Sequence, residues 1–267
     1  MTKNKLIKDT IKSLSEFETI NFSNINRDTR IFFKFSNEKV VLVREIISIM
    51  KPKKTYSVLE IGCGEGHVIK KIYRKVKKCI ALDPDPKMLD ILRQKIGKVS
   101  NVVLITKTFE DYKTEEKFDI ILTSHTLSFF DDKWKAVEKM LNYTKEGGKI
   151  IIVLHSNSSE QIKILREIFH KVYRKTIKHI YAEALYDRLV AYGLEPKLKK
   201  IETISKLPSI DTACEMSYFL FRIDYQKARD DVKNLIRTYL EKRRKNKYVE
   251  ISTTHGIIIL CKNHFTT

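Results

Sequence analysis

A glycine-rich segment in the first third of the chain has the residue types of a ligand-binding turn. Residues 58–66 have the sequence VLEIGCGEG, so Gly62, Gly64 and Gly66 follow directly on an apolar run. Glycine permits positive φ angles and lets a ligand approach the backbone without meeting a Cβ atom. The pattern predicts a buried strand, a ligand-binding turn, and a helix that starts after the turn. Its spacing is shorter than the G-x-G-x-x-G pattern that places a pyrophosphate at a helix N-terminus.

Two acidic residues accompany this turn. Glu60 lies two residues before the first glycine, where a carboxylate would repel a pyrophosphate and suit a positively charged ligand. Asp83 lies at the end of the next apolar run, where a carboxylate can accept hydrogen bonds from both hydroxyls of a ribose. Asp83 could instead cap the following helix, but Asp85 suits that role better. The turn and Asp83 together favour a ligand-binding role over a purely structural one.

Alternating strands and helices are expected to position these residues. Apolar, β-branched runs predict buried strands at Ser57–Ile61, Lys78–Leu82, Val102–Thr106, Phe118–Thr123 and Lys149–Leu154. Amphipathic segments between them predict helices at Val68–Val76, Pro86–Ile96 and Lys133–Thr144. Repeated strand–helix units of this length predict a parallel sheet with right-handed crossovers.

The flanking segments predict further elements around this sheet. Helical spacing of apolar residues predicts helices over 5–17 and 37–50, with a loop over Arg27–Phe35 between them. Later patterns predict helices near 158–173, 181–192, 211–221 and 226–245, and strands near 198–205 and at Val249–Cys261. We expect residues 1–50 to form an N-terminal helical cap on the core. Residues 51–267 would form one domain, with helical substrate-cover insertions at about 156–192 and 207–246.

The chain is strongly basic, with 52 Lys and Arg against 33 Asp and Glu and a formal net charge of +19. The basic residues are 39 Lys and 13 Arg, whereas bidentate recognition of phosphates and bases favours Arg. The clusters at Lys197–Lys200 and Lys242–Lys245 could follow a phosphate backbone, or they could be solvated faces. The charge alone therefore does not indicate a nucleic-acid partner.

Cysteine usage and apolar runs bound the class of protein further. The four cysteines are scattered, and no Cys or His pair has the spacing of a zinc site, so we expect neither a metal nor disulfides. The first residues lack the apolar run of a signal peptide, and no run has the ~20 apolar residues of a membrane helix. We expect a cytoplasmic protein that does not contact the membrane, as a monomer or homodimer.

The motifs resemble those of class I S-adenosylmethionine-dependent methyltransferases, over about residues 37–155. Glu60–Gly66 is similar to the first motif of that family, and Asp83 matches its ribose-binding acid. Thr106–Asp111 matches the stretch that contacts the adenine edge, although Thr108 stands where many members carry Asp. The resemblance implies a Rossmann-like seven-stranded, mostly parallel sheet with helices on both faces. It implies that S-adenosylmethionine is held by Glu60, Gly62, Gly64, Gly66, Asp83, Thr108, Phe109 and Ser124.

A weaker resemblance, to small-molecule methyltransferases of the histamine N-methyltransferase type, extends through the whole chain. It places His125 and Thr253 at polar acceptor-binding positions, Phe129 near an aromatic wall, and Glu38 close to the amine of the acceptor. The aromatic clamp expected after the fifth strand is absent, because Glu160 and Ile164 occupy its positions, so histamine itself is not the expected acceptor. The substrate-binding residues implied are Glu38, His125, Phe129, His155 and Thr253.

His125 is the candidate catalytic residue. It follows the fourth predicted strand, on the edge where parallel sheets bind ligands, and imidazole accepts a proton near neutral pH. Alternatively it only shapes the pocket, since methyl transfer often requires mainly alignment. His155 could face the acceptor or be solvated, whereas His255 has the position of a structural histidine. Phe32, Phe33 and Phe35 could form a lid or pack the N-terminal helix.

The predicted function is S-adenosylmethionine-dependent methyl transfer to N or O of a small molecule. The first alternative is an RNA methyltransferase, which the net charge supports. Against it, the segment after the fourth strand contains neither an Asn-Pro-Pro-Tyr-like motif nor a Pro-Cys nucleophile. The second alternative is a cofactor-binding scaffold without activity, which the intact glycine turn and Asp83 oppose.

Overall fold

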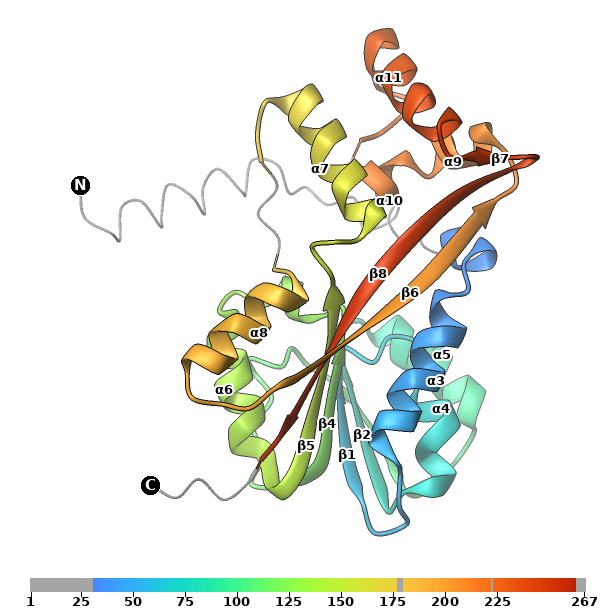
Figure 1. Cartoon of the computed structure of the whole chain (residues 1–267). Helices are drawn as coiled ribbons and strands as arrows, with labels where there is room; N and C mark the ends of the chain where they lie inside the picture. Colours follow the sequence, from blue (N-terminus) through green and yellow to red (C-terminus); the bar gives the residue numbers. More distant parts are fainter. Residues whose placement is uncertain (1–30, 177–179, 222, 263–267) are drawn as a thin grey trace.

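A mixed sheet forms the centre of the molecule, with the strand order β3-β2-β1-β4-β5-β8-β6 and β7 paired to β8 (Figure 1). The computed structural model describes residues 31–176 and 180–262, apart from residue 222. The strands are β1 (Ser57–Ile61), β2 (Lys78–Asp83), β3 (Val102–Thr106), β4 (Phe118–Ser124), β5 (Thr144–His155), β6 (Lys197–Leu207), β7 (Arg244–Lys245) and β8 (Tyr248–Cys261). Strands β1 to β5 pair in parallel, and β8 lies antiparallel between β5 and β6. The expected Rossmann-like α/β fold is confirmed, with the short β7 as an eighth strand.

Helices cover both faces of the sheet, because successive strand residues point to opposite sides. One face carries Leu59 and Ile121 and packs against α6 (Lys133–Tyr143) and α8 (Ala182–Ala191). The opposite face carries Val58 and packs against the three helices drawn to the right of the sheet in Figure 1. These are α3 (Glu38–Met50), α4 (Ile69–Ile72) and α5 (Pro86–Ile96).

A separate helical layer lies over the far ends of β6 and β8, at the top of Figure 1. It consists of α7 (Glu160–Tyr173), α9 (Ile210–Glu215), α10 (Ser217–Phe221) and α11 (Asp230–Glu241). Phe32 lies at its centre with no exposed surface, and its ring centroid is 4.6 Å from that of Phe219. The layer has its own apolar core, distinct from the two cores that flank the sheet.

Several predicted boundaries differ from the structure. The loop expected over Arg27–Phe35 is wrong where it is described, since residues 31–35 are helical and Phe32 packs on the upper layer. The single helix expected near 211–221 is two short helices, α9 and α10, and α11 is shorter than the predicted 226–245. The predicted helix Val68–Val76 is α4 followed by the 3₁₀ turn η1 (Tyr73–Lys75). The predicted helix over 5–17 lies outside the described residues.

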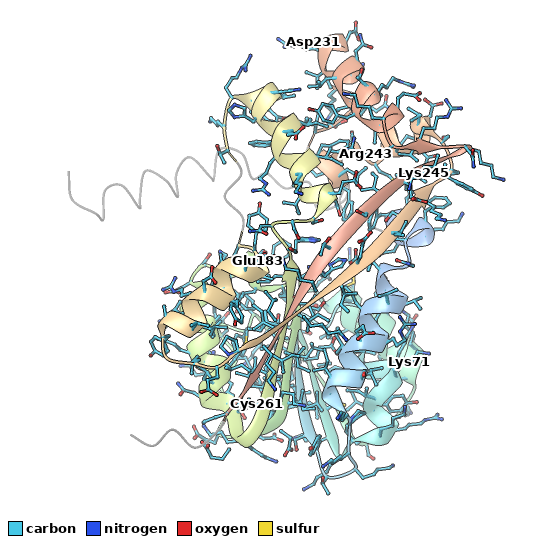
Figure 2. The ribbon with its side chains drawn as sticks, in the orientation of Figure 1. Lys71, Glu183, Asp231, Arg243, Lys245 and Cys261 are labelled. Carbon is cyan, nitrogen blue, oxygen red and sulfur yellow. The ribbon has the colours of Figure 1, made fainter. Side chains whose placement is uncertain are left out.

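The basic clusters lie beside acidic side chains. Figure 2 shows Arg243 and Lys245 at the upper end of the β8 region and Glu183 at the start of α8. Ion pairs join Lys199 to Glu45, Lys200 to Glu183, Arg243 to Glu160, Arg244 to Glu241, and Lys245 to Glu250. These clusters are therefore locally balanced, not blocks of bare positive charge. None of the helices in the described ranges is both long and apolar enough to cross a membrane.

Candidate functional site

The glycine turn has the left-handed backbone that its sequence predicts. Gly62, Gly64 and Gly66 have φ angles of 67°, 51° and 70°, a region that costs residues with a Cβ atom. A Cβ at Gly62 would lie 2.2 Å from Oγ1 of Thr126, so the turn lies directly against the segment after β4. A Cβ at Gly64 would meet no atom within 4 Å, so the space above this residue is open to a ligand.

Asp83 links the glycine turn to the turn after β2. Its Oδ2 accepts a hydrogen bond from the Gly64 N–H at 2.8 Å, and its Oδ1 accepts one from the Asp85 N–H at 3.0 Å. Burial raises the pKa of this carboxyl above its usual value. Each carboxylate oxygen has two lone pairs, so both oxygens can accept a further bond from a ribose hydroxyl. Asp85 caps α5 through the Lys87 N–H, which leaves Asp83 to the ligand role predicted for it.

Glu60 is buried beneath the glycine turn and is not exposed to a ligand above it. Its side chain is buried on the α4 face of the sheet, where the carboxylate accepts a hydrogen bond from the backbone of Ile69. Burial, with a smaller contribution from the nearby Asp83, raises the pKa of Glu60 to about 8. The geometry gives Glu60 a role in holding the start of α4 beneath the turn, and the predicted contact with the cofactor remains a prediction.

Thr108, Phe109 and Ser124 lie on the same edge of the sheet but face different surroundings. Thr108 is exposed, and its hydroxyl donates to Oδ2 of Asp111 at 2.8 Å. The Phe109 ring is buried in the core against Tyr143, so an adenine contact at this position would fall to its backbone. Ser124 ends β4, and its carbonyl oxygen accepts the hydroxyl of Thr126 at 3.1 Å.

His125 is held at the end of β4 with an unusual backbone. Its φ angle is 57°, and its N–H donates to the carbonyl of Val153 at 2.9 Å, which fixes the residue against β5. Its Nε2 lies 4.0 Å from Oε1 of Glu38, the first residue of α3. Burial raises the pKa of Glu38 to about 7, so this carboxyl exchanges its proton near neutral pH. The structure thus brings together two residues that the sequence places near the acceptor.

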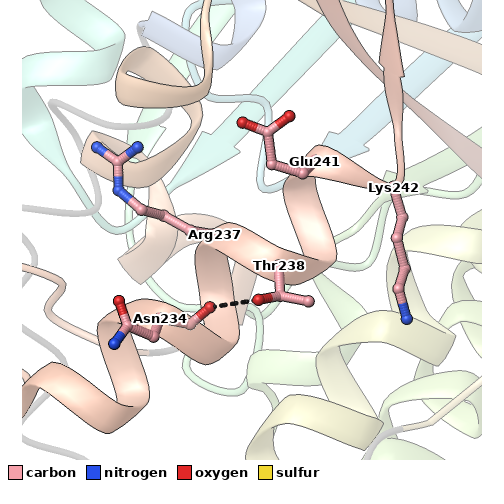
Figure 3. Close-up of a pocket in the computed structure, with 5 residues that line it drawn as sticks. All are labelled: Asn234, Arg237, Thr238, Glu241 and Lys242. Atoms are coloured by element: carbon pink, nitrogen blue, oxygen red, sulfur yellow. Dashed lines mark hydrogen bonds between the residues drawn. The ribbon is translucent and has the colours of Figure 1, made fainter.

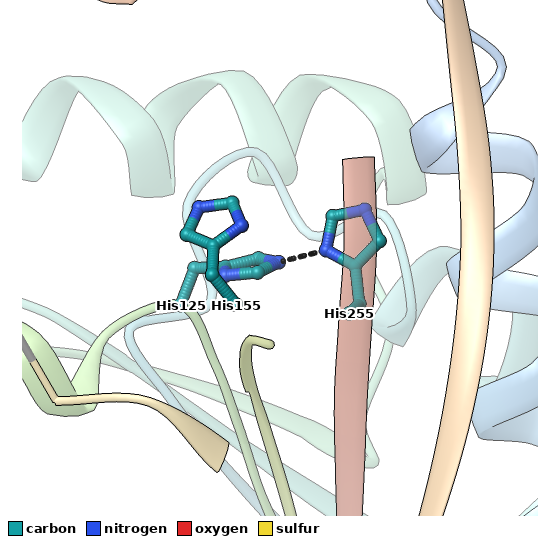
Figure 4. A group of neighbouring side chains, drawn as sticks. All are labelled: His125, His155 and His255. Atoms are coloured by element: carbon teal, nitrogen blue, oxygen red, sulfur yellow. Dashed lines mark hydrogen bonds between the residues drawn. The ribbon is translucent and has the colours of Figure 1, made fainter. Parts of the chain in front are cut away.

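Three histidines meet at this point (Figure 4). His155 ends β5 directly opposite His255 in the β5–β8 ladder, and Nδ1 of His255 lies 3.2 Å from Nε2 of His125. Nε2 of His255 lies 2.9 Å from the Thr203 hydroxyl, and its side chain has no exposed surface. Burial, and secondarily His155, lowers the pKa of His255 to about 3, so this imidazole is neutral. His255 is the site residue that the sequence assigned to structure alone.

The other two predicted acceptor residues, Thr253 and Phe129, make their side-chain contacts away from the three histidines. Thr253 is buried, and its hydroxyl donates to Oε1 of Gln161 at 2.6 Å, so it ties β8 to α7. Thr253 and His255 are two positions apart in β8, so their side chains point to the same face of the sheet. Phe129 is 67% exposed in the 3₁₀ turn η2 (Leu127–Phe129), where it lines open surface.

A surface hollow elsewhere does not coincide with these residues. It lies against α11 and is lined by Asn234, Arg237, Thr238, Glu241 and Lys242 (Figure 3). The lining comes from one helix and the residue that follows it, and Thr238 Oγ1 donates to the Asn234 carbonyl at 2.8 Å. Ligand sites usually have polar groups that converge from several elements, as they do at the strand ends. We therefore place the site at the glycine turn and not in this hollow.

Comparison with known proteins agrees with the geometry of the turn and the strand order. The model of the family described as "Methyltransferase domain" matches residues 59–152, which run from β1 to β5. Residues 59–152 are a methyltransferase domain. The domain is of class I, whose members depend on S-adenosylmethionine, and the family predicted from the glycine motif and Asp83 is confirmed.

One curated relative of the methyltransferase domain is malonyl-[acyl-carrier protein] O-methyltransferase 1 from Ilyobacter polytropus. It is 27% identical over 139 residues, which cover 51% of this chain and 52% of the relative. The chain thus spans about half the length of this relative. The match therefore does not define the acceptor of this chain.

Two solved structures share the fold of the methyltransferase. The YcgJ protein from Bacillus subtilis has a TM-score of 0.61 and 20% identity, over 83% of this chain and 98% of its own. A methyltransferase from Thermotoga maritima, described as a possible histamine N-methyltransferase, has a TM-score of 0.53 and 18% identity, over 90% and 96%. At these identities the likeness extends to the fold alone.

Proposed function

We propose that the protein transfers a methyl group from S-adenosylmethionine to a nitrogen or oxygen atom of a small-molecule acceptor. The observation that carries this proposal is the contact between two parts of one sheet edge. The cofactor half comprises the turn Gly62–Gly66, Asp83 and Thr108, and the acceptor half comprises Glu38, His125, His155 and His255. The two halves meet at Gly62. A Cβ atom added there would lie 2.2 Å from Oγ1 of Thr126, the residue after His125.

The residues of the cofactor half fit S-adenosylmethionine. Open space above Gly64 admits a ligand close to the backbone, and the Asp83 carboxylate keeps lone pairs for two ribose hydroxyls. Bound there, S-adenosylmethionine supplies a methyl group on a positively charged sulfur. The Asp83 carboxylate, and that of Glu38 when it is ionised, favour a cationic ligand.

The acceptor half supplies groups that orient an acceptor and hold its proton. His125 has 25% of its side chain exposed, and its Nε2 lies near His255 and Glu38. Alignment of the nucleophilic atom with the methyl group lowers the barrier most when both partners are held rigidly. We expect His125 to contact the acceptor and Glu38, with a pKa of about 7, to accept a proton behind it.

A transfer experiment tests this proposal. The protein is incubated with S-adenosylmethionine labelled at the methyl group and with a cell extract separated into fractions by size. We expect label in the small-molecule fraction with wild type and with Asp90→Ala, an exposed acid on α5. Asp83→Ala should give none. Label only in macromolecules, or equal label with Asp83→Ala, would overturn the proposal.

A second candidate is O-methylation of a carboxyl group carried on a protein. The relative from Ilyobacter polytropus, a malonyl-[acyl-carrier protein] O-methyltransferase, supports it, and the net charge of +19 suits an acidic carrier. Purified malonyl-carrier protein, offered in the same assay, separates the two. Saturable labelling of the carrier at low salt, with none in the small-molecule fraction, would favour this candidate.

The structure weakens the support for an RNA substrate. Lys199, Lys200, Arg243 and Arg244 pair with carboxylates, and phosphates would have to replace those partners. The scaffold alternative has less support as well, because Gly62, Gly64, Gly66 and Asp83 keep a ligand-ready geometry. A cytoplasmic location and the state of monomer or homodimer remain predictions from the sequence.

A further inference from the structure

The three histidines of the acceptor half have the arrangement of metal ligands. One nitrogen each from His125, His155 and His255 lies within 4.8 Å of the other two (Figure 4). Ligand nitrogens at 2.0–2.1 Å from a tetrahedral Zn²⁺ are about 3.3 Å apart. Nε2 of His125 and Nδ1 of His255 are already 3.2 Å apart, which is the spacing of two ligands on one ion. We propose that these three imidazoles bind a first-row divalent transition-metal ion.

The hydrogen bonds around His255 orient it for this role. The Thr203 hydroxyl lies 2.9 Å from Nε2 of His255, where it can accept the Nε2–H and leave the Nδ1 lone pair directed at His125. Metal-binding histidines commonly have their second nitrogen held in this way, which fixes the ring and its tautomer. Only one hydrogen fits between the two nitrogens of the 3.2 Å contact, and a metal ion would use both lone pairs in its place.

The carboxyl group of Glu38 lies beside the three imidazoles and supplies negative charge when it is ionised. Its oxygens lie 3.7 Å from Nε2 of His255 and 4.0 Å from Nε2 of His125. A divalent ion needs such compensation when it is removed from water. Lys39 follows Glu38 in α3, and its ammonium lies over the Phe33 ring at 4.1 Å.

The ligands come from rigid elements, as a preformed site requires. His155 and His255 are opposite one another in the β5–β8 ladder, and His125 is fixed by its backbone hydrogen bond to Val153. The His255 side chain closes the inner side of the cluster, whereas His125 is partly exposed. Three protein nitrogens with one open side are typical of metal sites that bind a substrate or water in the fourth position.

The role of the ion depends on the proposed function, but its binding does not. In a methyltransferase, an ion at this place would bind an acceptor through an oxygen, nitrogen or sulfur atom beside the glycine turn. A metal-bound hydroxyl or thiol loses its proton more readily and keeps a lone pair for the methyl group. The imidazoles would then orient the acceptor through the ion and not through hydrogen bonds of their own.

Metal titration of the full chain, without a histidine tag, tests the inference. Chelator-treated protein is titrated with Co²⁺ while its visible absorption is recorded, and Zn²⁺ then competes for the same site. We expect one equivalent to bind to wild type and to His170→Ala, an exposed histidine on α7. His155→Ala should weaken binding by at least ~100-fold, and Thr203→Val, which keeps the shape of the side chain, by ~10-fold.

The variants avoid His255, because its side chain is entirely buried and its loss could unfold the chain. No stoichiometric binding by wild type, or binding that His155→Ala and Thr203→Val leave unchanged, would overturn the metal site. S-adenosylmethionine is titrated into the same samples, and its affinity should stay within ~2-fold in both variants. Failure of cofactor binding with intact metal binding would count against the proposed function and not against the ion.

Discussion

The cofactor half and the acceptor half of the site share one sheet edge but are built differently. The cofactor half comes from neighbouring segments, since β1, its turn and β2 follow one another in the chain. The acceptor half joins residues far apart in the chain, and His125 and His255 alone are 130 positions apart. Local sequence determines the first half, whereas the second exists only once α3 and β8 have packed on the sheet. A variant in the cofactor half should thus change cofactor binding, and one in the acceptor half should change turnover.

The largest expected effect is on cofactor affinity when Asp83 is removed. Asp83→Ala loses two hydrogen bonds to ribose hydroxyls and leaves the N–H groups of Gly64 and Asp85 without their acceptor. Hydrogen bonds to a charged group contribute ~1.5–3 kcal/mol each, so affinity for S-adenosylmethionine should fall at least ~100-fold. Calorimetric titration measures this, with Asp90→Ala as the control that should match wild type. An unchanged affinity would remove Asp83 from the site.

His125 should show the opposite division between binding and turnover. His125→Asn is the better variant, because Asn tolerates the φ of 57° that Ala would strain. Loss of the imidazole should slow methyl transfer by roughly 100-fold, with cofactor affinity within ~2-fold of wild type. Single-turnover kinetics and titration measure the two quantities, with His170→Ala as the control. If the variant lost cofactor affinity as strongly as activity, the two halves would not have separate roles.

Two glycines with positive φ angles and open surroundings give a comparison. Gly64 and Gly97 both have positive φ angles, and a Cβ added at either would meet no atom within 4 Å, but only Gly64 lies in the cofactor half. Ala should destabilise the fold by about 1–3 kcal/mol at either position. Only Gly64→Ala should also weaken S-adenosylmethionine binding, by ~10-fold. Equal cofactor affinity of the two variants would show that the space above Gly64 is not used.

The buried carboxyl of Glu60 should make stability depend on pH. Its folded pKa of about 8 lies above the ordinary value of 4.5, so the folded state holds a proton that the unfolded state has lost. Its stabilising contribution is complete below about pH 4.5 and is lost as pH rises through 8. Between pH 6 and 8, the loss of unfolding free energy should be smaller in Glu60→Gln than in wild type by about 1 kcal/mol or more.

Chemical unfolding at several pH values measures the effect of Glu60. Glu65→Gln, on the same turn, is the control, because hydrogen bonding to Lys95 lowers the pKa of Glu65 and places its titration below this range. Parallel slopes for wild type and Glu60→Gln would contradict a buried, protonated Glu60.

The smallest effect is expected from surface charge. Lys199→Glu and Arg244→Glu each disrupt an exposed ion pair, and such pairs contribute little to stability. Methyl transfer to a small molecule should change less than ~2-fold. A loss of more than tenfold that disappears at high salt would point to a macromolecular acceptor.

The strand, the glycine turn and the position of Asp83 could be predicted from the sequence for a physical reason. A buried β-branched strand, a turn that needs glycine, and an acid after the next strand are all local features. The structure also brings Glu38 to 4.0 Å from His125, two residues that the resemblance separately implied near the acceptor. Glu60 differs, because its side chain points to the α4 face beneath the turn and accepts a backbone hydrogen bond from Ile69 there.

The histidine cluster could not be predicted from local sequence patterns. His155 and His255 meet because β8 inserts antiparallel beside β5 in one register, and a shift of one residue would turn His255 to the other face. The upper layer was also harder to delimit, since its helices pack mainly on each other. The break between α9 and α10 occurs at Met216, which is buried in that core, without a Gly or Pro to mark it.

The most direct test of the account is a crystal structure with S-adenosylhomocysteine bound. We predict that its ribose contacts Asp83, that its homocysteine part lies over Gly62–Gly66, and that its sulfur atom faces His125 from the cofactor half. A sulfur atom directed away from the histidine cluster, or a ligand bound elsewhere on the sheet edge, would contradict the joint site.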